Sequence, residues 1–298
     1  MCEEYAMVFE SIVSPESAEK RPWITFFLAF GLTSIAIFLA HYIFPQHSSL
    51  SIVFLTTLFF VPLFYRTMIY EEEKDIKENV EERHLLKEHA RALWFFLYLF
   101  MGMTLAFMFW HALISTTGIM GMDAEVVFEV QQSTIEHINN PVQGKVVEGG
   151  LGRSLALAGS IFENNLKVMI FCILFSFIYG AGAIFILTWN ASVIGLALSN
   201  YALSILAAQT ASGYAFASGC SLVRYMIHGI PEIAAYFIAA LAGGIMSVAL
   251  VRYHFGSEKF EKVVVDASTL VLIAVGVLLI AMIIEVFVSL RYLGNVCG

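Results

Sequence analysis

The stretch IAAYFIAALAGGIMSVAL, residues 233–250, runs for eighteen residues without a charge. The hydrocarbon core of a bilayer is about 30 Å thick, and an α-helix of about 20 apolar residues crosses it. The stretch therefore predicts a transmembrane helix, which we place at residues 230–251. Directly before it lies HGIPE, residues 228–232, in which Gly229 and Pro231 indicate a helix start. A histidine and a carboxylate thus stand where this helix enters the membrane.

The composition of the whole chain indicates a polytopic membrane protein. Of its 298 residues, 59% are hydrophobic and 13% are charged, whereas soluble domains carry about 25% charged residues. The predicted fold is all-α: a bundle of about seven transmembrane helices with short interfacial helices. We expect the spans at residues 23–44, 48–69, 92–117, 166–189, 191–208, 230–251 and 267–290.

Charge and cysteine usage exclude several classes of function. The formal net charge of −8 argues against a nucleic-acid partner, because binding phosphate requires a basic surface. The four cysteines lack CxxC spacing, so the sequence contains no zinc-finger or redox motif. The acidic start MCEEYAMVFE does not resemble a signal peptide, and we expect the first span to be retained.

The basic residues predict the orientation, because cytoplasmic loops of membrane proteins are enriched in lysine and arginine. With the N-terminus inside, eleven of these residues lie on the cytoplasmic side and five lie outside. We therefore predict a multi-pass protein of the plasma membrane with a cytoplasmic N-terminus and an external C-terminus.

Four segments outside the spans have predicted roles of their own. Residues 1–22 predict an amphipathic stub on the inner leaflet. Mixed charges at i,i+4 spacing in residues 70–91 predict a solvated cytoplasmic helix, with a partner-docking helix as the alternative. Residues 118–165 predict an outer loop with surface helices. Residues 209–228 are too polar for a clear span and predict a re-entrant or interfacial piece.

Small residues predict close contacts between helices. Glycines at small-xxx-small spacing let two backbones approach each other in a membrane. We expect the fourth, fifth and sixth spans to pack in this way and to form the inner bundle. The glycines concerned are Gly180, Gly182, Gly195, Gly243 and Gly244.

Polar side chains from five spans fall near one depth below the outer surface, if each helical residue rises about 1.5 Å. They are His111, Asn164, Asn165, Gln209, His228, Glu232 and Glu285. A charge in hydrocarbon costs at least ~2.5 to 3.5 kcal/mol, so these groups should face inward and bind one another. The pattern predicts an intramembrane polar site in the outer leaflet.

The chemistry of this polar site stays open between three alternatives. His228, Glu232 and Glu285, with His111 as a fourth ligand, suit Zn or a similar divalent ion. Glu232 would then be the candidate catalytic base of an intramembrane metal-dependent hydrolase or peptidase. A structural clasp between helices is the second alternative, and a pathway for a small solute or an ion is the third.

Three stretches of the chain resemble the stage II sporulation protein M family of integral membrane proteins. They are IFENNLKVMIFCILFSFIYGAGAIFILTWNASVIGLAL (161–198), HGIPEIAAYFIAALAGG (228–244) and LLIAMIIEVFVS (278–289). The opening residues 7–40 resemble the N-terminal extension of archaeal members. The resemblance implies a five-helix domain at 92–298, preceded by a stub, two spans and a charged helix at 1–91. The residues that match the family are Asn164, Asn165, Gly180, Gly182, Asn190, Gly195, His228, Gly229, Glu232 and Glu285, whereas Ala191 departs from an Asn-Gly turn common in relatives.

The resemblance implies a partner subunit. The namesake of the family, in spore-forming bacteria, is a membrane component of a complex whose other proteins degrade peptidoglycan. We therefore expect an integral membrane scaffold that lies in the lipid bilayer and binds a protein partner or a second copy of itself. An archaeal-type member would lack the bacterial peptidoglycan partners.

Overall fold

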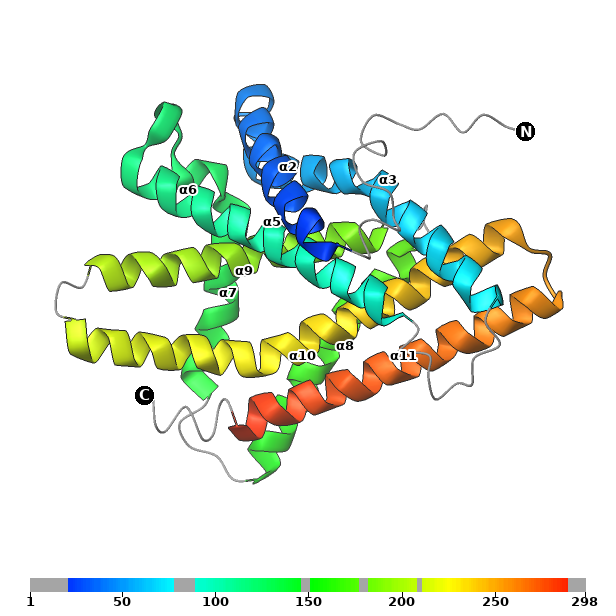
Figure 1. The fold of residues 1–298 in the computed structure, drawn as a ribbon. Coiled ribbons are helices and arrows are strands. Elements are labelled where there is room, and N and C mark those ends of the chain that lie inside the picture. The colour runs from blue at the N-terminus through cyan, green and yellow to red at the C-terminus, as the bar shows by residue number, and fades with distance from the viewer. Residues whose placement is uncertain (1–20, 78–88, 146–150, 177–181, 208–210, 289–298) are drawn as a thin grey trace.

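The computed structural model describes residues 21–77, 89–145, 151–176, 182–207 and 211–288 (Figure 1). All regular elements in these residues are helices, which confirms the all-α prediction. The long helices are α2 (Pro22–Ile43), α3 (Ser48–Lys77), α5 (Ala90–Thr117), α7 (Glu129–Lys145), α8 (Leu151–Ser176), α9 (Gly182–Ala207), α10 (Ala211–Arg252) and α11 (Glu258–Ile284). Two short helices, η2 (Ile119–Gly121) and α6 (Ala124–Val127), follow α5. Residues 1–20 of the predicted amphipathic stub lie outside the described residues, and Pro22 already begins α2.

Seven helices of the described chain are long and apolar enough to cross a membrane, which confirms the predicted number of spans. These spans are Pro22–Ile43, Ser48–Lys74, Ala90–Thr117, Ala158–Ser176, Ala183–Ser204, Gly229–Arg252 and Glu258–Val288. The protein is therefore a multi-pass membrane protein, and a lipid bilayer surrounds it.

The boundary between the fourth and fifth spans was predicted wrongly. The prediction placed it at Asn190 and Ala191, but both residues lie inside α9. Asn190 Nδ2 donates a hydrogen bond to the Ile186 carbonyl at 2.8 Å, so this polar side chain is satisfied within its own helix. α8 is described up to Ser176 and α9 from Gly182. Hydropathy alone does not mark a chain reversal inside a continuous apolar run.

The start of α10 also differs from the prediction. The prediction began a helix at HGIPE, but α10 runs continuously from residue 211 to residue 252, with Pro231 inside it. Residues 211–228, most of the predicted re-entrant or interfacial piece, are therefore helical and continuous with the sixth span. Transmembrane helices tolerate an internal proline because neighbouring groups satisfy the freed backbone carbonyl. Figure 1 shows that α10 bends part-way, and an internal proline is the usual cause of such a bend.

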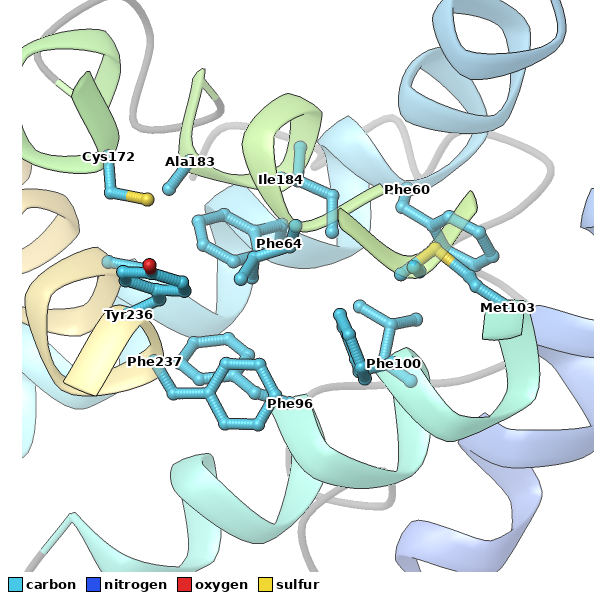
Figure 2. Close-up of a cluster of buried hydrophobic side chains, with 14 of the residues drawn as sticks. Phe60, Phe64, Phe96, Phe100, Met103, Cys172, Ala183, Ile184, Tyr236 and Phe237 are labelled. Atoms are coloured by element: carbon cyan, nitrogen blue, oxygen red, sulfur yellow. The ribbon is translucent and has the colours of Figure 1, made fainter. Parts of the chain in front are cut away.

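The second half of α10 lies at the centre of the molecule. In the apolar stretch of this half, 78% of the residues are buried inside the molecule. The corresponding shares are 17% for the span in α8 and 22% for the span in α11. Figure 2 shows Phe237 of α10 beside Phe96 and Phe100 of α5; the Phe100–Phe237 ring centroids are 5.7 Å apart. Phe64 of α3 stacks on Phe96 at 5.2 Å. These aromatic contacts join α10 to α5, and α5 in turn to α3.

Candidate functional site: a polar cluster between three spans

One carboxyl group joins three of the helices. Asn165 of α8 donates a hydrogen bond from Nδ2 to Glu232 Oε1 of α10, at 2.5 Å. The side chain of Glu232 also hydrogen bonds to that of Glu285, which follows α11. All three side chains are partly buried. We call Asn165, Glu232 and Glu285 the Glu232 cluster.

The hydrogen bond between the two carboxyl groups has a chemical consequence. An ionised carboxylate only accepts hydrogen bonds, so a bond between two of them requires that one carries its proton. Asn165 donates to that acid pair as an uncharged partner. Sharing a proton lowers the cost of placing two acids in a membrane span.

At Glu285 the helix changes from α-helical to π-helical geometry. The α-helical part of α11 ends at Ile284, and residues 285–288 form a π-helical turn. The backbone N–H of Glu285 contacts the carbonyls of both Ala281 and Met282. A π-turn adds one residue to the turn and is frequent at functional sites. The Glu232 cluster therefore combines a proline-interrupted helix with a widened one.

The other predicted residues of the polar layer do not join this cluster through any contact recorded among the described side chains. His111 of α5 faces α9, where its Nδ1 is 2.7 Å from Ser199 Oγ, and its ring packs edge-on against Phe128. Asn164 is exposed, although Asn165 beside it is not. Gln209 and the side chain of His228 lie outside the described residues.

The donor set of the Glu232 cluster does not by itself form a metal site. Among the described side chains, no group of three histidines, cysteines or acids lies close enough to hold a metal ion. Zinc sites use three or four such ligands. Glu232 and Glu285 are two of the predicted ligands, and a third would have to be His228.

A comparison with known families assigns the chain. The family model described as Stage II sporulation protein M matches residues 24–290. The chain belongs to this family. The match includes the whole Glu232 cluster and all of the seven spans except the first two residues of the first, and it extends across residue 91, the predicted domain boundary. Comparisons with curated proteins and with solved structures give no match.

A second polar contact in this stage II sporulation protein M family member holds α7 against the bundle. Gln131 is fully buried, and its amide exchanges hydrogen bonds with the side chain and the carbonyl of Ser49 in α3, at 2.5 and 3.1 Å. Asn200 of α9 donates to the neighbouring Gln132 at 2.9 Å. The sequence analysis missed these residues, although two adjacent amides in a helix with an apolar face were the available signal.

The glycines of this family member pack against several different helices. A Cβ on Gly195 would lie 2.7 Å from both Phe107 Cβ and the Thr104 carbonyl, so α9 closely approaches α5. Gly243 faces Ser176 of α8, and Gly244 faces the Met68 side chain of α3. Gly182 begins α9, and Gly180 lies outside the described residues. The contact of Gly195 is thus with the third span, whereas we expected the fourth or sixth.

A second group of buried ionisable side chains lies at the C-terminal end of α10. Glu71 and His89 are fully buried, with Glu71 Oε2 2.5 Å from His89 Nδ1, and Glu71 also pairs with Lys74. Glu72 is fully buried and accepts from Arg252 at 3.0 Å. Part of the segment predicted to be a solvated helix is therefore an internal ion network. Charge spacing along the sequence gave no sign of this, because it does not report what packs on a helix.

The ion network connects α3, α5 and α10. Arg252 ends α10 and also binds Glu73, at 3.1 Å. Burial, together with the neighbouring Glu72 carboxylate, raises the pKa of Tyr253 to about 12. Tyr253 therefore stays protonated over the whole physiological pH range. Polar contacts thus hold both ends of the second half of α10, at Glu232 and at Arg252.

Proposed function

We propose that this member of the stage II sporulation protein M family is a membrane scaffold or partner subunit, in which the Glu232 cluster forms an intramembrane polar site. The observation that supports it is that Glu232 binds both Asn165 and Glu285, which lie on two other helices. The recorded polar contacts of the cluster connect helices to one another. Such contacts specify how spans assemble and which surface they present to a partner.

Cross-linking in native membranes tests the scaffold role. The native chain and Glu163→Gln, an exposed acid on α8, should recover the same partner or the same second copy of the chain. Glu232→Ala should recover less of it, because the spans that bear the contact surface are no longer tied together. Recovery that is equal for all three chains would contradict the role of the cluster. Recovery of uncross-linked chain alone would contradict the scaffold itself.

A second candidate function is transport of a proton, another ion or a small solute. The paired acids within two spans favour it, because ionisable groups inside membrane helices mark ion pathways. Flux into proteoliposomes should then fall with Glu285→Gln, which keeps a hydrogen bond and removes the acid. An unchanged flux would contradict this candidate.

The metal-dependent hydrolase remains a prediction that depends on His228. Protein purified without chelator should hold one equivalent of zinc or a similar ion, and the variant His228→Ala with Glu232→Gln should hold none. Absence of stoichiometric metal from both samples would exclude Glu232 as a metal-assisted base.

We further propose that the N-terminus is cytoplasmic and the C-terminus external. The support is the distribution of basic residues, eleven against five, over the two sides of the predicted topology. The ion network of Glu71, Glu72 and Arg252 would then lie at the cytoplasmic side.

A further inference from the structure

The packing of α10 changes at Pro231. After it, Ala235, Ala239 and Ala240 are fully buried, and the polar contacts of Glu232 begin one residue beyond the proline. Before it, Ile230 is 61% exposed and Ile227 is 37% exposed. Among the described side chains of α10, the continuous run of buried residues therefore begins at Ala235, after the proline, and the two isoleucines before the proline are exposed.

The backbone is also weakest at this point. Pro231 has no N–H, so the helix loses the hydrogen bond that residue 231 would donate to the Ile227 carbonyl. Gly229 adds conformational freedom, and a Cβ placed there would meet no atom within 4 Å. The membrane span within α10 begins at this same glycine in the structure, so the weak point separates the span from residues 211–228.

We propose that Gly229–Pro231 is a hinge about which residues 211–227 of α10 change their angle to the transmembrane part of the helix. The Glu232 cluster anchors one side of the hinge, because it ties Glu232 to α8 and α11. A change of 20° at Pro231 moves residue 215, sixteen residues away, by about 8 Å. The hinge converts a small backbone change beside the cluster into a large displacement of this helical arm.

Distances between spin labels in nanodiscs test the hinge. In a chain without its native cysteines, labels at position 105 of α5 and position 215 of α10 report on the arm. Labels at positions 105 and 272 report on the fixed bundle, and both Leu105 and Leu272 are exposed. We expect a distance distribution several ångströms wider for the first pair than for the second. Pro231→Ala should narrow the first distribution to the width of the second, and Gly229→Ala should narrow it in part.

Pro62→Ala is the matched control, because Pro62 also lies inside a transmembrane helix, α3, and not in α10. It should leave the distribution between positions 105 and 215 unchanged. An unchanged distribution between positions 105 and 272 shows that a variant keeps its fold. If Pro231→Ala does not keep its fold, the test uses Gly229→Ala in its place. Equal widths for both pairs in the parent chain would overturn the hinge. Equal narrowing by Pro62→Ala would overturn it as well.

Discussion

At the scale of single residues, Glu232 has the most consequences for the account. Its carboxyl group meets an amide from α8 and a second carboxyl group from α11. A buried polar group that loses its partner costs the full free energy of its desolvation, about 1–3 kcal/mol. Replacing Glu232 therefore removes a hydrogen-bond partner from both Asn165 and Glu285.

Glu232→Ala should destabilise the protein by about 1–3 kcal/mol, because Asn165 and Glu285 lose their common partner. Glu232→Gln should cost less, since its amide donates to Glu285 and its carbonyl accepts from Asn165. Reversible unfolding in mixed micelles measures both changes. Glu163→Gln is the control, because its side chain is 67% exposed and solvent screens its pair with Lys167. A loss for Glu232→Ala no larger than for the control would contradict the proposed tie.

The sequence predicted Glu232, Glu285 and Asn165 as neighbours for a physical reason. Their cost in hydrocarbon required a partner, and their depth limited which partners were available. The same reasoning grouped His111 with them, whereas the structure pairs His111 with Ser199. Depth along a helix does not give the direction in which a side chain points, and serine was too common among the spans to be noticed as a partner.

At the scale of helices, close backbone contact at glycine fixes the packing. Gly195→Ala would place its Cβ 2.7 Å from the backbone carbonyl of Thr104, so α5 and α9 must separate. We expect a loss of about 1–3 kcal/mol from overpacking. Gly244→Ala should cost less, because the flexible Met68 side chain can move away.

The control for these glycines is Gly276→Ala in α11, where an added Cβ meets nothing within 4 Å. Alanine favours a helix over glycine by about 1 kcal/mol, so this variant should unfold at a higher temperature than the native protein. Thermal unfolding compares the three variants. A loss for Gly276→Ala as large as that for Gly195→Ala would contradict the assigned contacts.

The ion network makes a second prediction at this scale. Arg252→Gln leaves the fully buried Glu72 without its cation. The cost should be about 3 kcal/mol, the lower end for breaking a buried pair, because the Arg252 side chain is 37% exposed. Adding Glu72→Gln should recover part of that loss in a double-mutant cycle of unfolding free energies. Additive losses would show that the two side chains do not interact.

The lengths of helices were predicted less well than their number. Seven apolar runs were recognisable because each exceeds the thickness of the bilayer. The continuation of α10 through Pro231 was not recognisable from the sequence, because a proline before an apolar run usually begins a helix. Here the helix instead continues through the proline, within the packed bundle.

At the scale of the whole molecule, the buried core is continuous from α2 to α11. The proposed division at residue 91 remains a prediction about sequence, and both the core and the family match extend across it. Orientation in the membrane is the property of the whole chain that most needs measurement.

Single cysteines at Glu125 and Phe255, both exposed, test this orientation. A thiol reagent that does not cross membranes should label position 125 in intact cells, since the predicted outer loop contains it. Position 255, between α10 and α11, should be labelled only after the cells are permeabilised. The reverse pattern would invert the proposed topology.

The central claim is that Asn165, Glu232 and Glu285 meet inside the bundle. Cross-linking of engineered cysteine pairs in membranes tests it most directly, read as the rate at which each pair forms a disulfide. We predict fast formation for the pairs 165/232 and 232/285 and slow formation for 164/232, because Asn164 is exposed beside Asn165. Formation at 164/232 as fast as at 165/232, or none at 232/285, would contradict the account.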